Sequence, residues 1–187
     1  MRMFVALVPP VEAVEHHDEF LAVRREAAPF RWAMPEQFHV TLAFLADVPD
    51  RRLDDLVERL TRAARRRTAV ATRFAGGGAF PDPARARVLW GGLDLDETGR
   101  VEVARMATGA RAAASKSGID VDGQRFRPHL SLARLGRPTE VSPWVRLLDG
   151  YAGPTWRTTE WALIVSHLGE GPRKRPRYEV VERFEVA

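Results

Sequence analysis

HVTLAFL at residues 39–45 and HLSLARL at residues 129–135 are two versions of one heptapeptide, placed in opposite halves of a 187-residue chain. Four of the seven positions are identical, and two more are conservative exchanges, Val for Leu and Thr for Ser. Short apolar runs rich in Val, Leu, Phe and Thr are typical of β-strands. The repeat therefore predicts that each half of the chain supplies one strand of the same kind.

The period of a β-strand predicts what these two strands expose. Side chains two positions apart lie on the same face of a strand. His39 and Thr41 therefore share one face, and His129 and Ser131 share the corresponding face in the second copy. The apolar residues between them, such as Val40, anchor the other face. Two such strands brought together across a cleft would place two imidazoles and two hydroxyls in it.

This set of groups suits phosphodiester chemistry without a metal. One neutral imidazole can take a proton from an attacking water, and one protonated imidazole can give a proton to the leaving alkoxide, because the ordinary pKa of histidine lies near neutral pH. The Thr41 and Ser131 hydroxyls can hold the non-bridging phosphate oxygens, where charge builds up. Arg127 and Arg134 flank the second copy and are candidates for charge-assisted contacts with the same phosphate.

The rest of the chain mixes strands and helices without the regular alternation of a doubly wound parallel sheet, which predicts an α/β (α+β) fold. No Ser/Gly-rich linker divides it, so residues 1–187 are expected to form a single domain with two lobes.

Three glycines at residues 76–78 lack the spacing of a phosphate-binding fingerprint and are expected in a flexible loop. The predicted strands cover residues 3–8, 38–45, 69–74, 86–90, 129–135, 156–165 and 178–186. Four helices are predicted, and two of them cover residues 11–27 and 143–148. A third contains the apolar stripe from Leu53 to Leu60, with Asp50 as its N-cap. The fourth begins at a capping box formed by Asp94 and Glu97 and ends at Gly118.

Composition excludes several classes of function. The chain has no cysteine, so it has no disulfide, thiolate metal site or cysteine nucleophile. Its longest apolar runs are too short to cross a bilayer. The stretch at residues 1–10 meets two prolines without a small-residue cleavage site, so a first strand is expected there rather than a signal peptide, in a cytoplasmic protein.

The charge balance is a weaker signal. Lys plus Arg total 29 against 25 for Asp plus Glu, a net charge of +4, and only Lys116 and Lys174 are lysines. This excess suggests an anionic partner, although a genome rich in arginine codons explains it equally well. The three arginines at residues 65–67 are expected at a solvated helix end, where the helix dipole favours cations.

The other three histidines do not form a metal motif. His16 and His17 stand among acidic residues on a helix that is expected to be solvated, and His167 near a strand end is expected to be structural. The chain contains no HExxH and no clustered His and Asp, so neither a metal nor another cofactor is expected.

Beyond these two motifs, the chain resembles the two-histidine phosphoesterase superfamily, and within it the bacterial and archaeal RNA 2′,3′-cyclic phosphodiesterases formerly called 2′-5′ RNA ligases. The resemblance runs almost from end to end. It is carried by RMFVALVPP at residues 2–10, RWAMPEQFHVTLAFLADV at 31–48, ARVLWGGL at 86–93, FRPHLSLARLG at 126–136 and IVSHLGEGPRKRPRYEVV at 164–181.

The resemblance implies a bilobal, pseudo-twofold fold in which two antiparallel sheets with helices outside enclose a central cleft. It assigns His39 as proton donor and His129 as proton acceptor, with Thr41 and Ser131 on the phosphate. An arginine five positions after the second histidine matches Arg134, which strict alternation would place on the face opposite His129 unless the strand bends or ends there.

Three departures from the family pattern are Ser131 for the usual Thr, Ala46 where Gly is common, and His167 where Arg is common. The partner that the resemblance implies is an RNA with a 2′,3′-cyclic phosphate end, tRNA fragments included, acted on by a monomer with no membrane attachment. Two alternatives stay open: reversible 2′-5′ ligation of RNA ends in the same cleft, and an RNA- or nucleotide-binding module without turnover.

Overall fold

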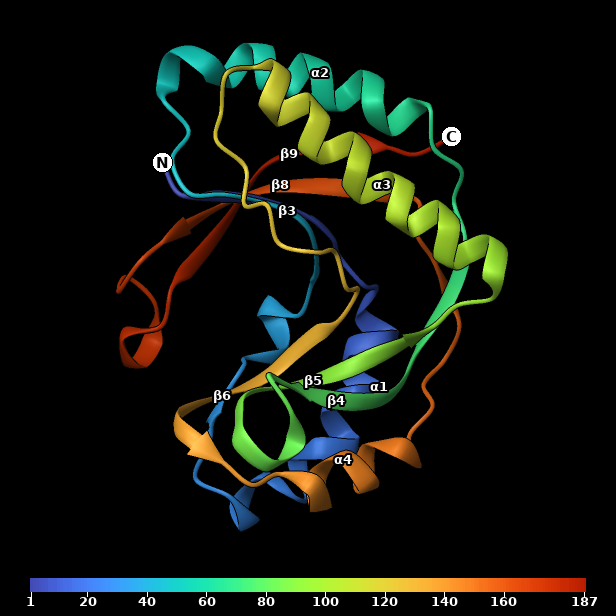
Figure 1. Cartoon of the computed structure of the whole chain (residues 1–187), viewed down its shortest axis with the longest axis vertical. Helices are drawn as coiled ribbons and strands as arrows, with labels where there is room; N and C mark the ends of the chain where they lie inside the picture. The colour runs from blue at the N-terminus through green and yellow to red at the C-terminus, as the bar shows by residue number, and fades with distance from the viewer.

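Two antiparallel sheets make up the centre of the molecule in the computed structural model, which describes all 187 residues (Figure 1). Sheet A has the strand order β3-β1-β8-β9, and sheet B has the order β2-β6-β5-β4-β7. Sheet A contains β1 (Met3–Leu7), β3 (Val40–Leu45), β8 (Glu160–His167) and β9 (Arg177–Glu185). Sheet B contains β2 (Arg31–Trp32), β4 (Ala71–Phe80), β5 (Ala86–Asp94), β6 (Leu130–Thr139) and β7 (Trp156–Arg157). The predicted α/β class is confirmed.

Four helices cover the sheets from outside. The pair α2 (Leu53–Arg65) and α3 (Glu97–Lys116) lies side by side over sheet A, in contact with β9 and β3 (Figure 1). The helices α1 (Val11–Ala22) and α4 (Ser142–Asp149) contact β4 of sheet B. Short 3-10 turns complete the chain at Arg25–Ala27, Pro35–Gln37, Asp50–Arg52, Pro83–Arg85 and Pro172–Lys174.

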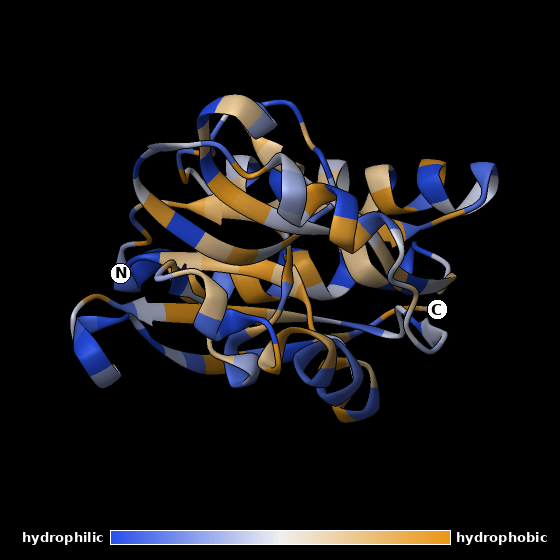
Figure 2. Cartoon of the chain, turned by 90° about the horizontal axis from the view of Figure 1, so that it is seen from below, coloured by the Kyte–Doolittle hydropathy of each residue, from blue (hydrophilic) through white to orange (hydrophobic).

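Strand β1 shows how the apolar pattern positions the core. It is buried on both faces, which explains its uninterrupted apolar sequence. Met3, Val5 and Leu7 belong to a cluster of 38 buried residues that also includes members of α2, α3 and sheet B. Phe4 and Ala6 point to the other face and form a smaller cluster with two residues of β8. Figure 2 shows the hydrophobic residues concentrated along the strands.

Both predicted helix caps are wrong. Asp50 begins a 3-10 turn that precedes α2, and it makes no capping bond. The N-cap of α3 is Asp96, whose side chain accepts a 2.6 Å hydrogen bond from the backbone N–H of Gly99, whereas Asp94 is the last residue of β5. Gly118 follows α3 with φ of +76°, as its predicted role at the helix end requires.

The glycine run is also placed differently from the prediction. Residues 76–78 lie inside β4, not in a loop. Gly76 has φ of +67° where the register between β4 and β5 shifts, the conformation that only glycine adopts without strain. A Cβ on Gly77 would lie 2.6 Å from both a Leu148 methyl and the Trp90 carbonyl oxygen. The glycines therefore shape a strand that passes close to α4 and β5.

The two sheets do not correspond to the two halves of the chain. The first half sends α1 and β2 to sheet B, and the last segment returns to sheet A as β8 and β9. Consequently the chain crosses between the sheets several times, and both of its ends lie at sheet A (Figure 1).

Candidate active site

The two motif histidines are held in the same way. His39 immediately precedes β3 and His129 immediately precedes β6. The Nδ1–H of His39 donates to the carbonyl of Gln37 at 2.7 Å, and the Nδ1–H of His129 donates to the carbonyl of Arg127 at 2.6 Å. Because a carbonyl can only accept, Nδ1 carries the proton in each ring. This leaves both Nε2 atoms available for chemistry.

Aromatic rings surround each imidazole. His39 stacks on Phe4 with ring centres 4.5 Å apart, and Tyr178 meets it edge-on at 5.6 Å. Phe80 meets His129 edge-on at 4.9 Å, and the Trp90 ring lies 6.2 Å away. These four rings were not identified from the sequence, since they come from strands far from either motif. They shield the imidazoles from water.

Removal from water controls how the imidazoles titrate. Burial lowers the pKa of His39 to about 4, opposed by its bond to the Gln37 carbonyl and reinforced by the positive charges of His129 and Arg134. Burial also lowers the pKa of His129, again with Arg134 adding to the effect and the Arg127 carbonyl opposing it. In the free protein both imidazoles are therefore neutral at pH 7, and they lie close enough to influence one another electrostatically.

Each motif strand contains a β-bulge at the same position. The register of β3 against β1 shifts between Val5 and Ala6, so that Leu42 is an extra residue. The register of β6 against β5 shifts between Leu89 and Trp90, so that Leu132 is the extra residue there. The repeat is thus a repeat of backbone geometry as well as of sequence.

The bulge resolves the position of Arg134. After it, Ala133 is buried and Arg134 is exposed on the side of half-buried Ser131, the reverse of strict alternation. Arg134 is also near enough for its positive charge to lower the pKa values of both histidines. The equivalent position in β3 is Phe44, on the side of half-buried Thr41. Neither hydroxyl is used in a hydrogen bond within the chain.

Arg127 supplies a backbone contact to His129 that the sequence did not indicate, and the predicted contact of its side chain with the phosphate stays a prediction. Its backbone carbonyl holds His129, whereas its side chain is exposed and forms no ion pair. Gln37 plays the same part for His39, and its side-chain amide donates to the Pro176 carbonyl at 2.7 Å. Gln37 was not singled out from the sequence, because its contribution comes from the backbone, which no residue pattern marks.

His17 departs from the expectation of a solvated helix. It is completely buried among Phe20, Phe38, Phe74 and Tyr151, and neither of its ring nitrogens has a hydrogen-bond partner. Burial lowers its pKa to about 4. Its neighbour His16 is exposed, and its Nδ1 lies 2.8 Å from the Tyr151 hydroxyl.

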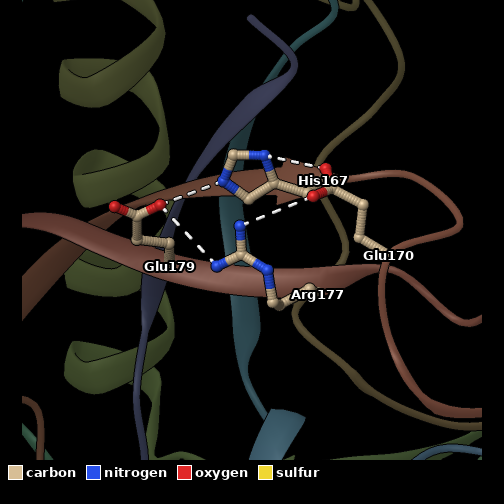
Figure 3. A network of polar contacts seen from close by, with 4 residues as sticks. All are labelled: His167, Glu170, Arg177 and Glu179. Atoms are coloured by element: carbon tan, nitrogen blue, oxygen red, sulfur yellow. Dashed lines mark hydrogen bonds and ion pairs between the residues drawn. The ribbon is translucent and has the colours of Figure 1, made fainter.

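His167 belongs to a network of its own, at the end of β8 (Figure 3). Its Nε2 lies 3.0 Å from a carboxylate oxygen of Glu179, and its Nδ1 lies 3.3 Å from Glu170. Arg177 reaches both carboxylates at 3.7 and 3.8 Å. These contacts are consistent with the structural role expected for His167. No group of three or more His, Asp or Glu side chains has the arrangement of a metal site, and no helix is both long and apolar enough to cross a membrane.

Several known proteins are similar to this chain. A family model described as LigT like phosphoesterase matches residues 9–90. The RNA 2′,3′-cyclic phosphodiesterase of Archaeoglobus fulgidus is 32% identical over 186 residues, which cover 99% of this chain and 100% of that protein. The protein of the same name from Thermus thermophilus is 29% identical, over 100% of this chain and 90% of its own. The chain spans only 56% of the Geobacillus stearothermophilus relative, at 30% identity.

Solved structures share the whole fold. The crystal structure of a Thermus thermophilus protein superposes with a TM-score of 0.79 at 29% identity, over 100% of this chain and 98% of that one. The apo structure of Escherichia coli LigT gives a TM-score of 0.77 at 23% identity, over 100% and 97% of the two chains. The arrangement of two sheets and four helices is therefore common to these proteins.

Proposed function

Because the chain belongs to the LigT-like family of RNA 2′,3′-cyclic phosphodiesterases, we propose that it opens 2′,3′-cyclic phosphates at RNA ends to 2′-phosphates. The observation that carries this proposal is the matched pair of imidazoles. Each has its Nδ1 proton fixed on a backbone carbonyl, which leaves its Nε2 free, and the charge of His129 influences His39. Hydrolysis of a phosphodiester requires one group that removes a proton from water and one that donates a proton to the leaving oxygen, and two imidazoles can supply both.

In the proposed reaction His129 acts as base and His39 as acid. Nε2 of His129 takes a proton from water as the water oxygen bonds to phosphorus. The bond between phosphorus and the 3′-oxygen breaks, and Nε2 of His39 gives its proton to that oxygen. The Thr41 and Ser131 hydroxyls and the Arg134 guanidinium stabilise the charge on the non-bridging oxygens.

Charge explains how a histidine with a depressed pKa can act as an acid. In the free protein burial disfavours the imidazolium form of both rings, and the positive charge of Arg134 adds to this effect. A bound phosphate brings negative charge beside both rings and offsets Arg134, which raises the pKa values of both imidazoles. The substrate thereby promotes the protonation that its own hydrolysis needs.

Hydrolysis of a cyclic-phosphate oligonucleotide by the purified chain, in EDTA, tests the proposed function. We expect conversion to a 2′-phosphate, identified by phosphorus NMR. The proposal fails if no conversion occurs or if a 3′-phosphate forms. Activity that EDTA abolishes and Mg²⁺ or Mn²⁺ restores would show that the two histidines are not sufficient.

A substrate with sulfur in place of the 3′-oxygen tests the two roles separately. A thiolate leaves without a proton, since a thiol has a pKa of about 8.5. We therefore expect the sulfur substrate to restore turnover to His39→Ala but not to His129→Ala. The reverse pattern would exchange the two assignments.

We further infer that residues 1–187 act as one bilobal domain, as a cytoplasmic monomer, on RNA ends that include tRNA fragments. The single large core cluster, which includes residues from both sheets, supports one domain. Light scattering after size exclusion checks the monomer, because a dimer would double the 21.0 kDa mass of the chain.

A further inference from the structure

A series of cations leads away from Arg134 across the edge of sheet B. The register of β2 against β6 sets Arg31 directly opposite Arg134, and directly opposed residues of antiparallel strands project from the same face. The next cations belong to the turn between β8 and β9, at residues 168–176, which extends from sheet A toward sheet B (Figure 1). We refer to Arg31, Arg173 and Arg175 together as the basic track.

Two hydrogen bonds join the β8–β9 turn to the neighbourhood of the site. The Arg175 guanidinium donates to the carbonyl of Trp32, the residue after Arg31, at 2.8 Å. The Pro176 carbonyl accepts the side-chain amide of Gln37, whose own carbonyl holds His39. The basic track is therefore attached to the same backbone segments that position Arg134 and His39.

The basic track carries uncompensated charge. None of its three arginines forms an ion pair. Partial burial and the positive charges of Arg31 and Arg173 lower the pKa of Arg175. The two acids nearest in sequence to Arg173 and Arg175, Glu170 and Glu179, are engaged with His167 and Arg177 instead (Figure 3). Like charges held together without an acid repel one another, and an anion bound among them relieves that repulsion.

The backbone of the β8–β9 turn is strained at two residues. Arg173 and Lys174 both have positive φ, 54° and 61°, in a region that side chains other than those of Gly, Asn and Asp rarely adopt. Such strain persists only where the surrounding structure imposes it, and it is concentrated at binding sites.

We propose that the basic track binds the phosphodiester groups of the RNA strand that precede the terminal nucleotide. The inference rests on the proposed function: with the cyclic phosphate between the two histidines, the rest of the strand has to leave the site, and the guanidinium groups that continue from Arg134 offer it a path. Guanidinium binds phosphate oxygens in a planar, bidentate manner. These contacts are independent of base identity, so the track distinguishes RNA ends from cyclic mononucleotides rather than one sequence from another.

The test compares substrates of increasing length in matched variants. The variant is Arg31→Gln with Arg173→Gln, two exposed residues without side-chain hydrogen bonds in the chain. The control is Arg65→Gln with Arg66→Gln at the end of α2, which removes the same charge from exposed, unpaired arginines on the helical side of sheet A. The kcat/KM is measured on a 2′,3′-cyclic mononucleotide and on longer cyclic-phosphate oligonucleotides at several salt concentrations, with fluorescence anisotropy of labelled RNA as a binding readout.

We expect the wild type to prefer oligonucleotides to the mononucleotide. The track variant should lose roughly tenfold or more in kcat/KM on oligonucleotides, keep its activity on the mononucleotide, and show a salt dependence of RNA binding shallower by about 1.4, which is the loss of two phosphate contacts at about 0.7 each. The control should follow the wild type.

Equal length preference and equal RNA affinity in the track variant and the wild type would overturn the inference, as would an equal loss in the control. A loss on mononucleotide and oligonucleotide alike would also contradict it, because the track would then act on the reacting phosphate itself. The proposed function fails separately, if the wild type converts no cyclic phosphate of any length. Even then the anisotropy measurement decides whether the track binds RNA.

Discussion

At the scale of single residues, we expect His39 and His129 to act as a unit, because the proposed reaction needs both proton transfers. Replacing either by Ala should lower kcat by roughly 10² to 10⁴-fold, the usual contribution of a positioned proton-transfer group. The double variant should be little slower than either single variant, since the losses of cooperating groups do not add. Steady-state kinetics on variants shown to be folded by circular dichroism gives the answer.

Two of the other histidines serve as controls for these variants. His16→Ala and His167→Ala remove an exposed side chain and a peripheral network, and both should turn over near the wild-type rate. His17→Ala is unsuitable, because it would open a cavity in the core. Near-normal turnover in folded His129→Ala would contradict the proposed base.

The depressed pKa values of the two imidazoles predict the pH dependence of the enzyme. In the proposed mechanism the reactive form has one imidazole protonated and the other neutral, and both pKa values lie below 6.5 in the free protein. The kcat/KM, which reports free enzyme, should therefore be bell-shaped with its optimum below pH 6.5, and it should fall as the pH rises through 7. The kcat should peak at higher pH, because bound phosphate raises both pKa values. A kcat/KM that still increases up to pH 8 would contradict this account.

At the scale of elements, the heptapeptide repeat made both motif strands predictable, along with the outward face of each histidine and hydroxyl. The position of Arg134 was not predictable from alternation, because a bulge is a property of the pairing between two strands and not of one sequence. The burial of His17 could not be predicted from the sequence for a related reason, since it depends on contacts with other segments. Its helix is rich in charge, but α1 packs under sheet B, where Phe74 and Tyr151 from distant segments enclose the ring.

Gly76 and Gly77 of β4 give a prediction at the scale of elements. Gly77 is needed because a side chain would not fit, whereas Gly76 is needed because its φ is positive. Gly77→Ala forces a methyl against the Leu148 side chain and the Trp90 backbone and should destabilise by about 1–3 kcal/mol. Gly76→Ala meets no atom within 4 Å but must keep φ of +67°, at a cost of about 1 kcal/mol. Urea unfolding of the two variants measures the difference. Equal midpoints would show that β4 can move away from α4.

At the scale of the whole molecule, His17 makes stability depend on pH. Its pKa is about 4 in the folded protein and 6.5 in the reference state, so the unfolded chain binds the proton more tightly. The stability from a neutral His17 is complete above pH 6.5 and is lost as the pH falls toward 4. Between pH 8 and 5 the wild type should lose about 2 kcal/mol more than His17→Leu, which does not titrate.

Urea unfolding of the wild type and of His17→Leu at both pH values measures this difference. The other histidine with a similarly low pKa, His39, is present in both proteins, so its contribution cancels in the comparison. Identical losses in the two proteins would mean that the buried ring does not control acid stability.

The interleaving of the two sheets has a consequence for how the protein can be divided. A cut between the two halves of the chain, for example after α3, would leave the first fragment with α1, β4 and β5 but without β6, and with β1 and β3 but without β8. Neither fragment could complete a sheet, so neither should fold alone, whereas the two mixed together could regain activity. For the same reason calorimetry of the intact chain should show one heat-absorption peak whose van't Hoff and calorimetric enthalpies agree. The two sheets would then unfold together in one cooperative transition, although each has its own helices.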